Sequence, residues 1–191
     1  MPTGNLAPAL RLVPGEPIVP VYRVQLERTG SILAHVGRCD STEHVAELVR
    51  RYIGEPDREH FVAIYLDANY TVLALHTVAI GGRSSVAVSA AEVFKAGLLV
   101  NATGVTLAHN HPSGKAAPSK ADRVLTSELE IAGMIVGIQL IDHVILGDSD
   151  AVSMREADLM MIPIVGEFDC DAVLKGAAQD ARRDRRRAAN Q

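Results

Sequence analysis

The chain has 191 residues, of which 48% are hydrophobic and 22% are charged, a composition typical of one well-buried core with little room for a second full domain. Its formal net charge of −4 excludes a protein that coats nucleic acid along its whole length. The sequence has no run of about 18 apolar residues, so no membrane span is expected.

The two cysteines, Cys39 and Cys170, lie far apart, and neither belongs to a Cys-x-x-Cys pair. This spacing argues against a thiolate zinc site and is typical of a reducing compartment, although a disulfide between the two remains open. The N-terminal residues lack the charged segment and apolar core of a signal peptide. We therefore expect a cytoplasmic protein.

The first third of the chain predicts an arm, two strands and a helix. Residues 1–19 contain four prolines and predict a flexible N-terminal arm. The apolar residues that follow, up to about residue 37, predict two strands on either side of a turn at Thr29-Gly30. Residues 41–54 predict a helix, because Ser41 or Thr42 can cap its start and Gly54 its end.

The central segments alternate between strand and helix. Two β-branched apolar stretches predict a hairpin in a well-buried sheet, and the pair Ser89 and Glu92 forms a capping box that predicts the start of the next helix. The expected elements are a hairpin of residues 59–67 and 71–82, a helix of residues 90–102, a strand of residues 105–109, a helix of residues 119–133 and a strand of residues 137–147. This order predicts an α/β domain with a curved, mixed sheet flanked by helices, spanning residues 20–160.

The segment after residue 147 has a weaker pattern, and the last residues carry the basic run Arg182 to Arg187. Residues 161–191 are therefore predicted to be a C-terminal extension, either a frayed helix or disordered. The sequence has no glycine-rich phosphate loop and no dinucleotide fingerprint.

A candidate metal site follows the strand that ends at His109. His109 and His111 are two residues apart, so on a strand their rings point to the same side. Pro112-Ser113-Gly114 predicts a turn that lets Asp122, on the first turn of the next helix, approach the two rings. Two imidazoles and one carboxylate leave a fourth tetrahedral position for water, as in catalytic zinc sites. Ser119 and Asp122 alone also fit a capping box.

The string His-x-His-Pro, six residues, Ser, two residues and Asp resembles the JAMM motif of the JAB/MPN metalloprotease fold, which has a cytidine-deaminase-like architecture. The longer segments of residues 58–82, 90–122 and 137–147 are similar in order and spacing to the RadC branch of that superfamily. The resemblance covers about residues 56–156. It implies one Zn²⁺ per chain, held by His109, His111 and Asp122, and a protein or peptide substrate.

The resemblance also implies two catalytic residues. Glu59, at the start of an early core strand, matches the family's glutamate, which takes a proton from the metal-activated water and returns it to the leaving amine. Glu55 and Glu92 are the competitors, one lying before Pro56 and the other explained by its capping box. Ser119 matches the serine whose hydroxyl steadies the developing oxyanion.

Other polar residues carry open alternatives. Asp142-His143 resembles the RadC "DH" pair and is expected either to orient a ligand or to be a buried structural pair. Asn110 is expected to brace the loop. The helix–hairpin–helix segment of longer RadC proteins has no match in residues 1–50, so a nucleic-acid role in repair or recombination depends on the arginine run 182–187. The sequence does not indicate an oligomeric state.

Overall fold

A computed structural model describes residues 23–32, 37–81 and 88–161 of the protein. Helices and strands alternate along these residues, as the sequence predicts. Their order is α1 (Thr42–Ile53), β1 (His60–Leu66), β2 (Val72–Ile80), α2 (Ala90–Leu99), β3 (Gly104–Asn110), α3 (Lys120–Val136), β4 (Gln139–Leu146) and β5 (Ala151–Ser153).

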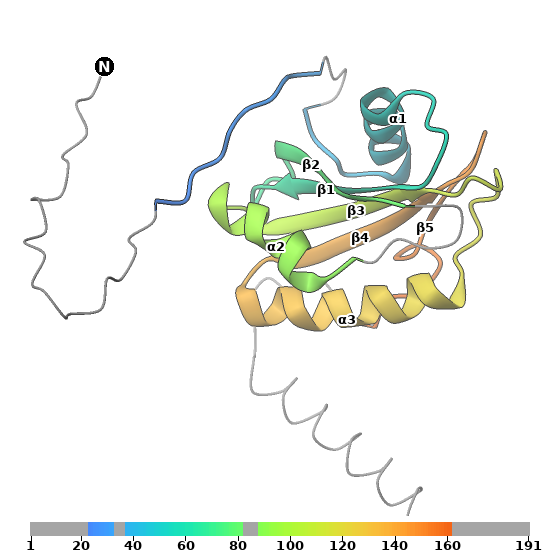
Figure 1. The fold of residues 1–191 in the computed structure, drawn as a ribbon. Helices are drawn as coiled ribbons and strands as arrows, with labels where there is room; N and C mark the ends of the chain where they lie inside the picture. The colour runs from blue at the N-terminus through green and yellow to red at the C-terminus, as the bar shows by residue number, and fades with distance from the viewer. Residues whose placement is uncertain (1–22, 33–36, 82–87, 162–191) are drawn as a thin grey trace, which may run out of the picture.

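The five strands form one mixed sheet in the order β2-β1-β3-β4-β5. β1 pairs antiparallel with both β2 and β3, β3 pairs parallel with β4, and β4 pairs antiparallel with β5. The parallel pair is joined through α3, since parallel neighbours need a crossover connection. The predicted α/β class with a mixed sheet and flanking helices is therefore confirmed (Figure 1).

Helices cover both faces of this sheet. α1 lies over one face, and α2 and α3 lie over the other (Figure 1). Alternate side chains of β1 point to opposite faces: Val62, Ile64 and Leu66 belong to the apolar cluster under α1, whereas Phe61, Ala63 and Tyr65 belong to the cluster under α2 and α3. The central strands are therefore buried on both sides, which explains their nearly continuous apolar sequence.

The helix starts follow the capping residues that the sequence predicts, but two helix ends differ: the helix predicted over residues 90–102 stops at Leu99. Ser41 caps α1 by accepting a hydrogen bond from the backbone of His44, and Gly54 follows its last residue. The prediction that α3 stops at Gly133 is wrong, because α3 continues to Val136 and ends at Gly137 in the left-handed region. Gly133 is needed for close packing, since a Cβ there would lie 2.5 Å from the Ile138 carbonyl oxygen.

Two expectations at the margins of the domain need correction. The predicted strand pair before residue 37 is wrong for residues 23–32, which form no strand; apolar alternation makes a strand only where a neighbour supplies hydrogen bonds. The weak pattern after residue 147 did not predict a strand, but β5 lies there and pairs antiparallel with β4 as an edge strand.

Several predicted segments fall outside the described residues. These are the arm of residues 1–19, the run 182–187 and all of the extension beyond Met161. Among the residues that the structure describes, none belongs to a helix that is long and apolar enough to cross a membrane.

Candidate metal centre

His109 lies near the end of β3, where neighbouring strands fix it on both sides. It is paired with Phe61 of β1 and with Ile145 of β4, and only 1% of its surface is exposed. The Phe61 ring stacks on the imidazole at a centroid distance of 5.5 Å and an interplanar angle of 13°. A histidine buried this deeply in an apolar layer needs partners for both ring nitrogens.

His111 follows β3 and is oriented by its own loop. Its backbone N–H donates to the Leu146 carbonyl, and its Nδ1 lies 2.8 Å from the Lys115 carbonyl oxygen. Gly114 allows this tight turn, because its φ of 75° is in the left-handed region. The turn predicted from Pro112-Ser113-Gly114 is thus present, and it leaves the Nε2 atom of His111 facing His109.

Asp122 is the third residue of α3 and takes part in the predicted capping box. Its backbone N–H donates to the Ser119 hydroxyl over 3.2 Å, and its Oδ2 accepts from the Ser119 backbone N–H over 2.6 Å. The two hydrogen bonds hold the carboxylate at the helix start, where the helix dipole favours a negative charge. Because it is held in this way, Asp122 faces the two histidines while it caps the helix.

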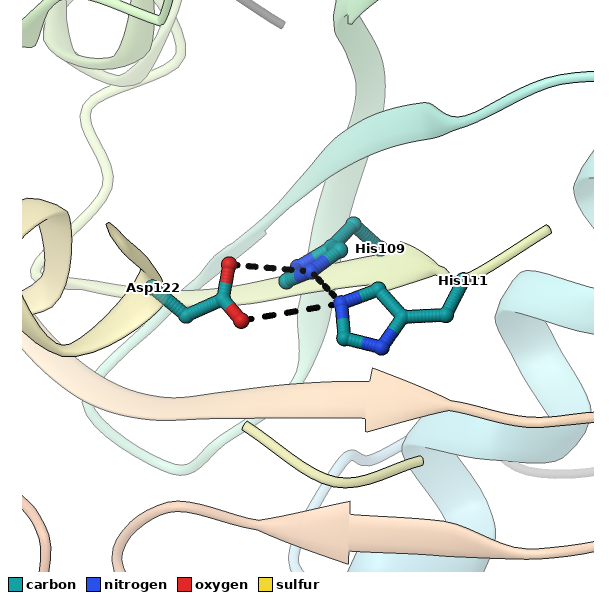
Figure 2. A group of neighbouring side chains, drawn as sticks. All are labelled: His109, His111 and Asp122. Carbon is teal, nitrogen blue, oxygen red and sulfur yellow. Dashed lines mark hydrogen bonds and ion pairs between the residues drawn. The ribbon is translucent and has the colours of Figure 1, made fainter. Parts of the chain in front are cut away.

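The three side chains converge on one point from two directions (Figure 2). The Nε2 atoms of His109 and His111 lie 3.0 Å apart, and each faces one carboxylate oxygen of Asp122, at 3.3 Å from His109 and 3.6 Å from His111. One ligand atom from each of the three residues lies within 4.8 Å of the other two. The three residues that the sequence predicts as metal ligands therefore lie together in the structure.

These separations fit a zinc ion. Two atoms bound tetrahedrally to zinc at 2.0–2.1 Å are about 3.3 Å apart, and the observed separations of 3.0, 3.3 and 3.6 Å bracket that value. The Nδ1 of His111 must donate its proton to the Lys115 carbonyl, which can only accept, so in the neutral ring the Nε2 lone pair faces the centre. Nitrogen and oxygen donors in this combination favour zinc among the common divalent metals.

The charge of Asp122 suits the same role. Partial burial alone raises the pKa of its carboxyl group, but the neighbouring His109 and the hydrogen bonds with Ser119 outweigh that effect and hold the pKa well below the usual range. Asp122 is therefore a carboxylate at neutral pH. It supplies one negative charge beside the two imidazoles, which can compensate the charge of a divalent cation.

Behind His109 lies a second set of buried polar groups. The Nδ1 of His109 is 2.9 Å from the Nε2 of His143 in β4, and the Nδ1 of His143 is 2.7 Å from the Thr126 hydroxyl oxygen in α3. Burial lowers the pKa of His143 well below that of a free imidazole, and His109 adds to this effect, so the ring is neutral. The alternative in which His143 orients a ligand is the one that the geometry favours.

Asp142 has a different role from its neighbour. Its carboxylate accepts hydrogen bonds from the backbone N–H groups of His143 and Arg155 and from the Ser153 hydroxyl. It therefore ties β4 to the end of β5 and is a structural residue. The sequence alone does not single out Thr126, although its position four residues after Asp122 places both on one face of α3.

Glu59 is one residue outside β1. The β1–β3 register begins with Phe61 paired with His109, two residues after Glu59. The Glu59 carbonyl accepts from the Gly81 backbone over 2.8 Å, which extends the β1–β2 ladder to this residue. Glu59 is partly exposed. Proton transfer by Glu59 therefore stays a prediction from the sequence.

Asn110, between the two histidines, points to the opposite side and braces the chain next to Glu59. Its Oδ1 accepts from the His60 backbone N–H over 2.8 Å, and its Nδ2 donates to the Arg58 carbonyl over 3.0 Å. The β3 backbone ends at this residue, so the Asn110 amide group provides the contacts that a continuing strand would make. The expectation that Asn110 is a brace agrees with these contacts.

Fold and site together define an α/β domain with a candidate metal centre at the end of its parallel strand pair. The chain belongs to the RadC-like JAB domain family, whose sequence pattern matches residues 39–159.

Three relatives named "UPF0758 protein" are similar to it. That of Rubrobacter xylanophilus is 40% identical over 139 residues, covering 72% of this chain and 61% of the relative. That of Desulforamulus reducens is 42% identical over 118 residues, covering 62% and 52%. That of Caldanaerobacter subterraneus is 38% identical over 116 residues, covering 61% and 50%. The chain thus spans half to about three-fifths of the relatives it matches.

Proposed function

We propose that this protein is a zinc-dependent hydrolase that uses a metal-activated water to cleave amide bonds in a protein or peptide substrate. One observation carries the proposal: the Nε2 atoms of His109 and His111 and the carboxylate of Asp122 converge with separations of 3.0, 3.3 and 3.6 Å. Membership of the RadC-like JAB domain family supports it, as does the resemblance of the segment with His109, His111 and Asp122 to the JAMM motif. The metal would be held as one ion per chain.

Zinc at this site would supply a water acidic enough to act as a nucleophile near neutral pH. The protein's own groups account for the remaining chemistry. Glu59, two residues before the Phe61 that pairs with His109, would accept the proton released by the attacking water and return it to the leaving amine. The Ser119 hydroxyl accepts one hydrogen bond from Asp122 and keeps its own proton, which it can donate to the developing oxyanion.

Hydrolysis of synthetic probes tests the proposal directly. Metal-free protein, reloaded with one equivalent of Zn²⁺, would be incubated with an internally quenched peptide library and with a peptide joined through a lysine isopeptide bond. We expect cleavage of at least one probe, loss of cleavage after chelation, and recovery on adding zinc. Cleavage that survives chelation, or a zinc-loaded protein that cleaves none of the probes, would contradict the proposed function.

A nucleic-acid-associated role in repair or recombination remains the alternative from the sequence. It depends on the arginine run 182–187, which is outside the described residues. DNA titration at two salt concentrations, with and without residues 182–191, tests this alternative. Binding that weakens steeply with salt and requires the tail would support a phosphate-binding role.

A further inference from the structure

The buried contacts behind His109 form a continuous chain from the candidate metal centre into α3. The chain runs from the Nδ1 of His109 to His143, from His143 to the Thr126 hydroxyl, and from that hydroxyl to the Asp122 backbone carbonyl, with successive distances of 2.9, 2.7 and 2.6 Å. His143 and Thr126 are fully buried, and His109 is 1% exposed. Since these groups are shielded from water, each proton between them must be accepted by another buried group of the protein.

The last contact fixes the direction of every hydrogen bond in the chain. The Thr126 hydroxyl has one proton, and two oxygens only 2.6 Å apart repel each other unless a proton lies between them. That proton therefore points to the Asp122 carbonyl, which can only accept, in preference to the weak Met154 sulfur acceptor at 3.4 Å. The hydroxyl oxygen must then accept the hydrogen bond from the Nδ1–H of His143.

The same logic passes through the His143 ring to His109. A neutral imidazole that donates from Nδ1 has a bare Nε2 atom, so the Nε2 of His143 accepts from the Nδ1–H of His109. The Nε2 of His109 is consequently left with a lone pair that faces Asp122 and His111. His111 reaches the same state by a separate route, through its hydrogen bond to the Lys115 carbonyl.

We propose that Thr126 and His143 are positioning residues that set the tautomer of His109 and so present its Nε2 lone pair to the metal. This inference rests on the proposed function, because it assumes that His109 is a ligand. It assigns to Thr126 a role that depends on its hydroxyl group and not only on its volume. If these hydrogen bonds ran in the reverse direction, a proton would lie on the Nε2 of His109, at the position where the metal would bind.

The test compares three variants with the full-length wild-type protein. Thr126→Val removes the hydroxyl and keeps the shape, Thr126→Ser restores the hydroxyl, and Thr126→Ala repeats the deletion if valine prevents folding. Ser127→Ala is the matched control, because the Ser127 hydroxyl also donates to the carbonyl four residues earlier on α3, that of Arg123, but is exposed. Long-range ¹H–¹⁵N correlation in metal-free, histidine-labelled protein reports which nitrogen of His143 has the proton. Titration with Zn²⁺ against a chelator reports affinity.

We expect the proton on Nδ1 of His143 in wild type, Thr126→Ser and Ser127→Ala, with similar zinc affinities. In Thr126→Val we expect it on Nε2, together with zinc binding that is about 10- to 100-fold weaker. An unchanged tautomer and unchanged zinc affinity in a folded Thr126→Val protein would overturn the inference and leave the proposed function intact. If the His143 tautomer shifts in Thr126→Val but the wild-type protein binds no zinc, the proposed hydrogen-bond directions would be supported and the metal site overturned.

Discussion

The two faces of the sheet are both tightly packed, but among the described residues the buried histidines lie on only one of them. The face under α1 is an apolar cluster that includes Val49, Ile64 and Val144. The face under α2 and α3 begins in the same way and then, at the end of β3, gives way to His109, His143 and Thr126. The comparison shows that the candidate centre is an extension of a core, so its ligands are held by the same packing that stabilises the fold.

The largest effect is expected from removing the two imidazoles. Wild-type protein should bind about one zinc per chain, and His109→Ala with His111→Ala should reduce this to almost none, because two of three ligands are lost. Metal analysis after dialysis measures the change. The control removes two histidines outside the centre, His44 and His76, and should keep the metal. If zinc content is the same in both double variants, His109 and His111 are not the zinc ligands.

The next largest effect separates catalysis from metal binding. Glu59→Gln should retain zinc and reduce hydrolysis by about 10²- to 10⁴-fold, because the amide cannot accept the proton. The control is Glu55→Gln, which changes an exposed residue four positions earlier and should leave the turnover number unchanged. Steady-state kinetics on a cleaved probe measures both. The reverse result would assign proton transfer to Glu55.

The apolar face can be tested through its cysteine. Cys39 is 3% exposed, and burial, with a contribution from Asp40, raises its pKa from 9.0 to about 11. At pH 7 its thiolate fraction is about 100-fold below that of a free thiol, so in a Cys170→Ser background it should react with a thiol reagent at least that much more slowly. Unfolding in urea should abolish the protection. Native and unfolded rates that are equal would mean that the α1 face opens readily.

The same thiol predicts a pH dependence. Its folded-state pKa lies above its unfolded value, so its contribution to stability is complete below about pH 9 and is lost as the pH rises towards 11. Relative to Cys39→Ala, the wild-type melting temperature should fall across that range. A difference between the two melting temperatures that does not vary with pH would contradict this assignment.

The smallest effect is expected at Asn110, which points away from the metal. Asn110→Ala removes the two hydrogen bonds that hold residues 58–60, and it should cost about 1 kcal/mol of stability. Because Glu59 would be held less firmly, turnover should fall by roughly tenfold while zinc content stays the same. Asn69→Ala in the exposed β1–β2 turn is the control. Loss of zinc in Asn110→Ala would assign this residue to the centre.

The parts of this structure that the sequence predicts are those governed by local rules. The helix starts at Ser41, Ser89 and Ser119 follow from capping, and the convergence of His109 and His111 follows from strand alternation. What could not be predicted depends on contacts between distant segments. β5 is a strand because β4 offers it an edge, and Gly133 is required by the Ile138 carbonyl. Thr126 gains its role only when β4 brings His143 against α3.

Zinc K-edge X-ray absorption of the zinc-loaded, full-length protein tests the central assignment most directly. The account predicts four nitrogen or oxygen ligands at about 2.0–2.1 Å, with outer-shell scattering from two imidazoles that disappears when His109 and His111 are replaced by alanine. Sulfur scattering near 2.3 Å, or an imidazole signal that persists in the double variant, would contradict it.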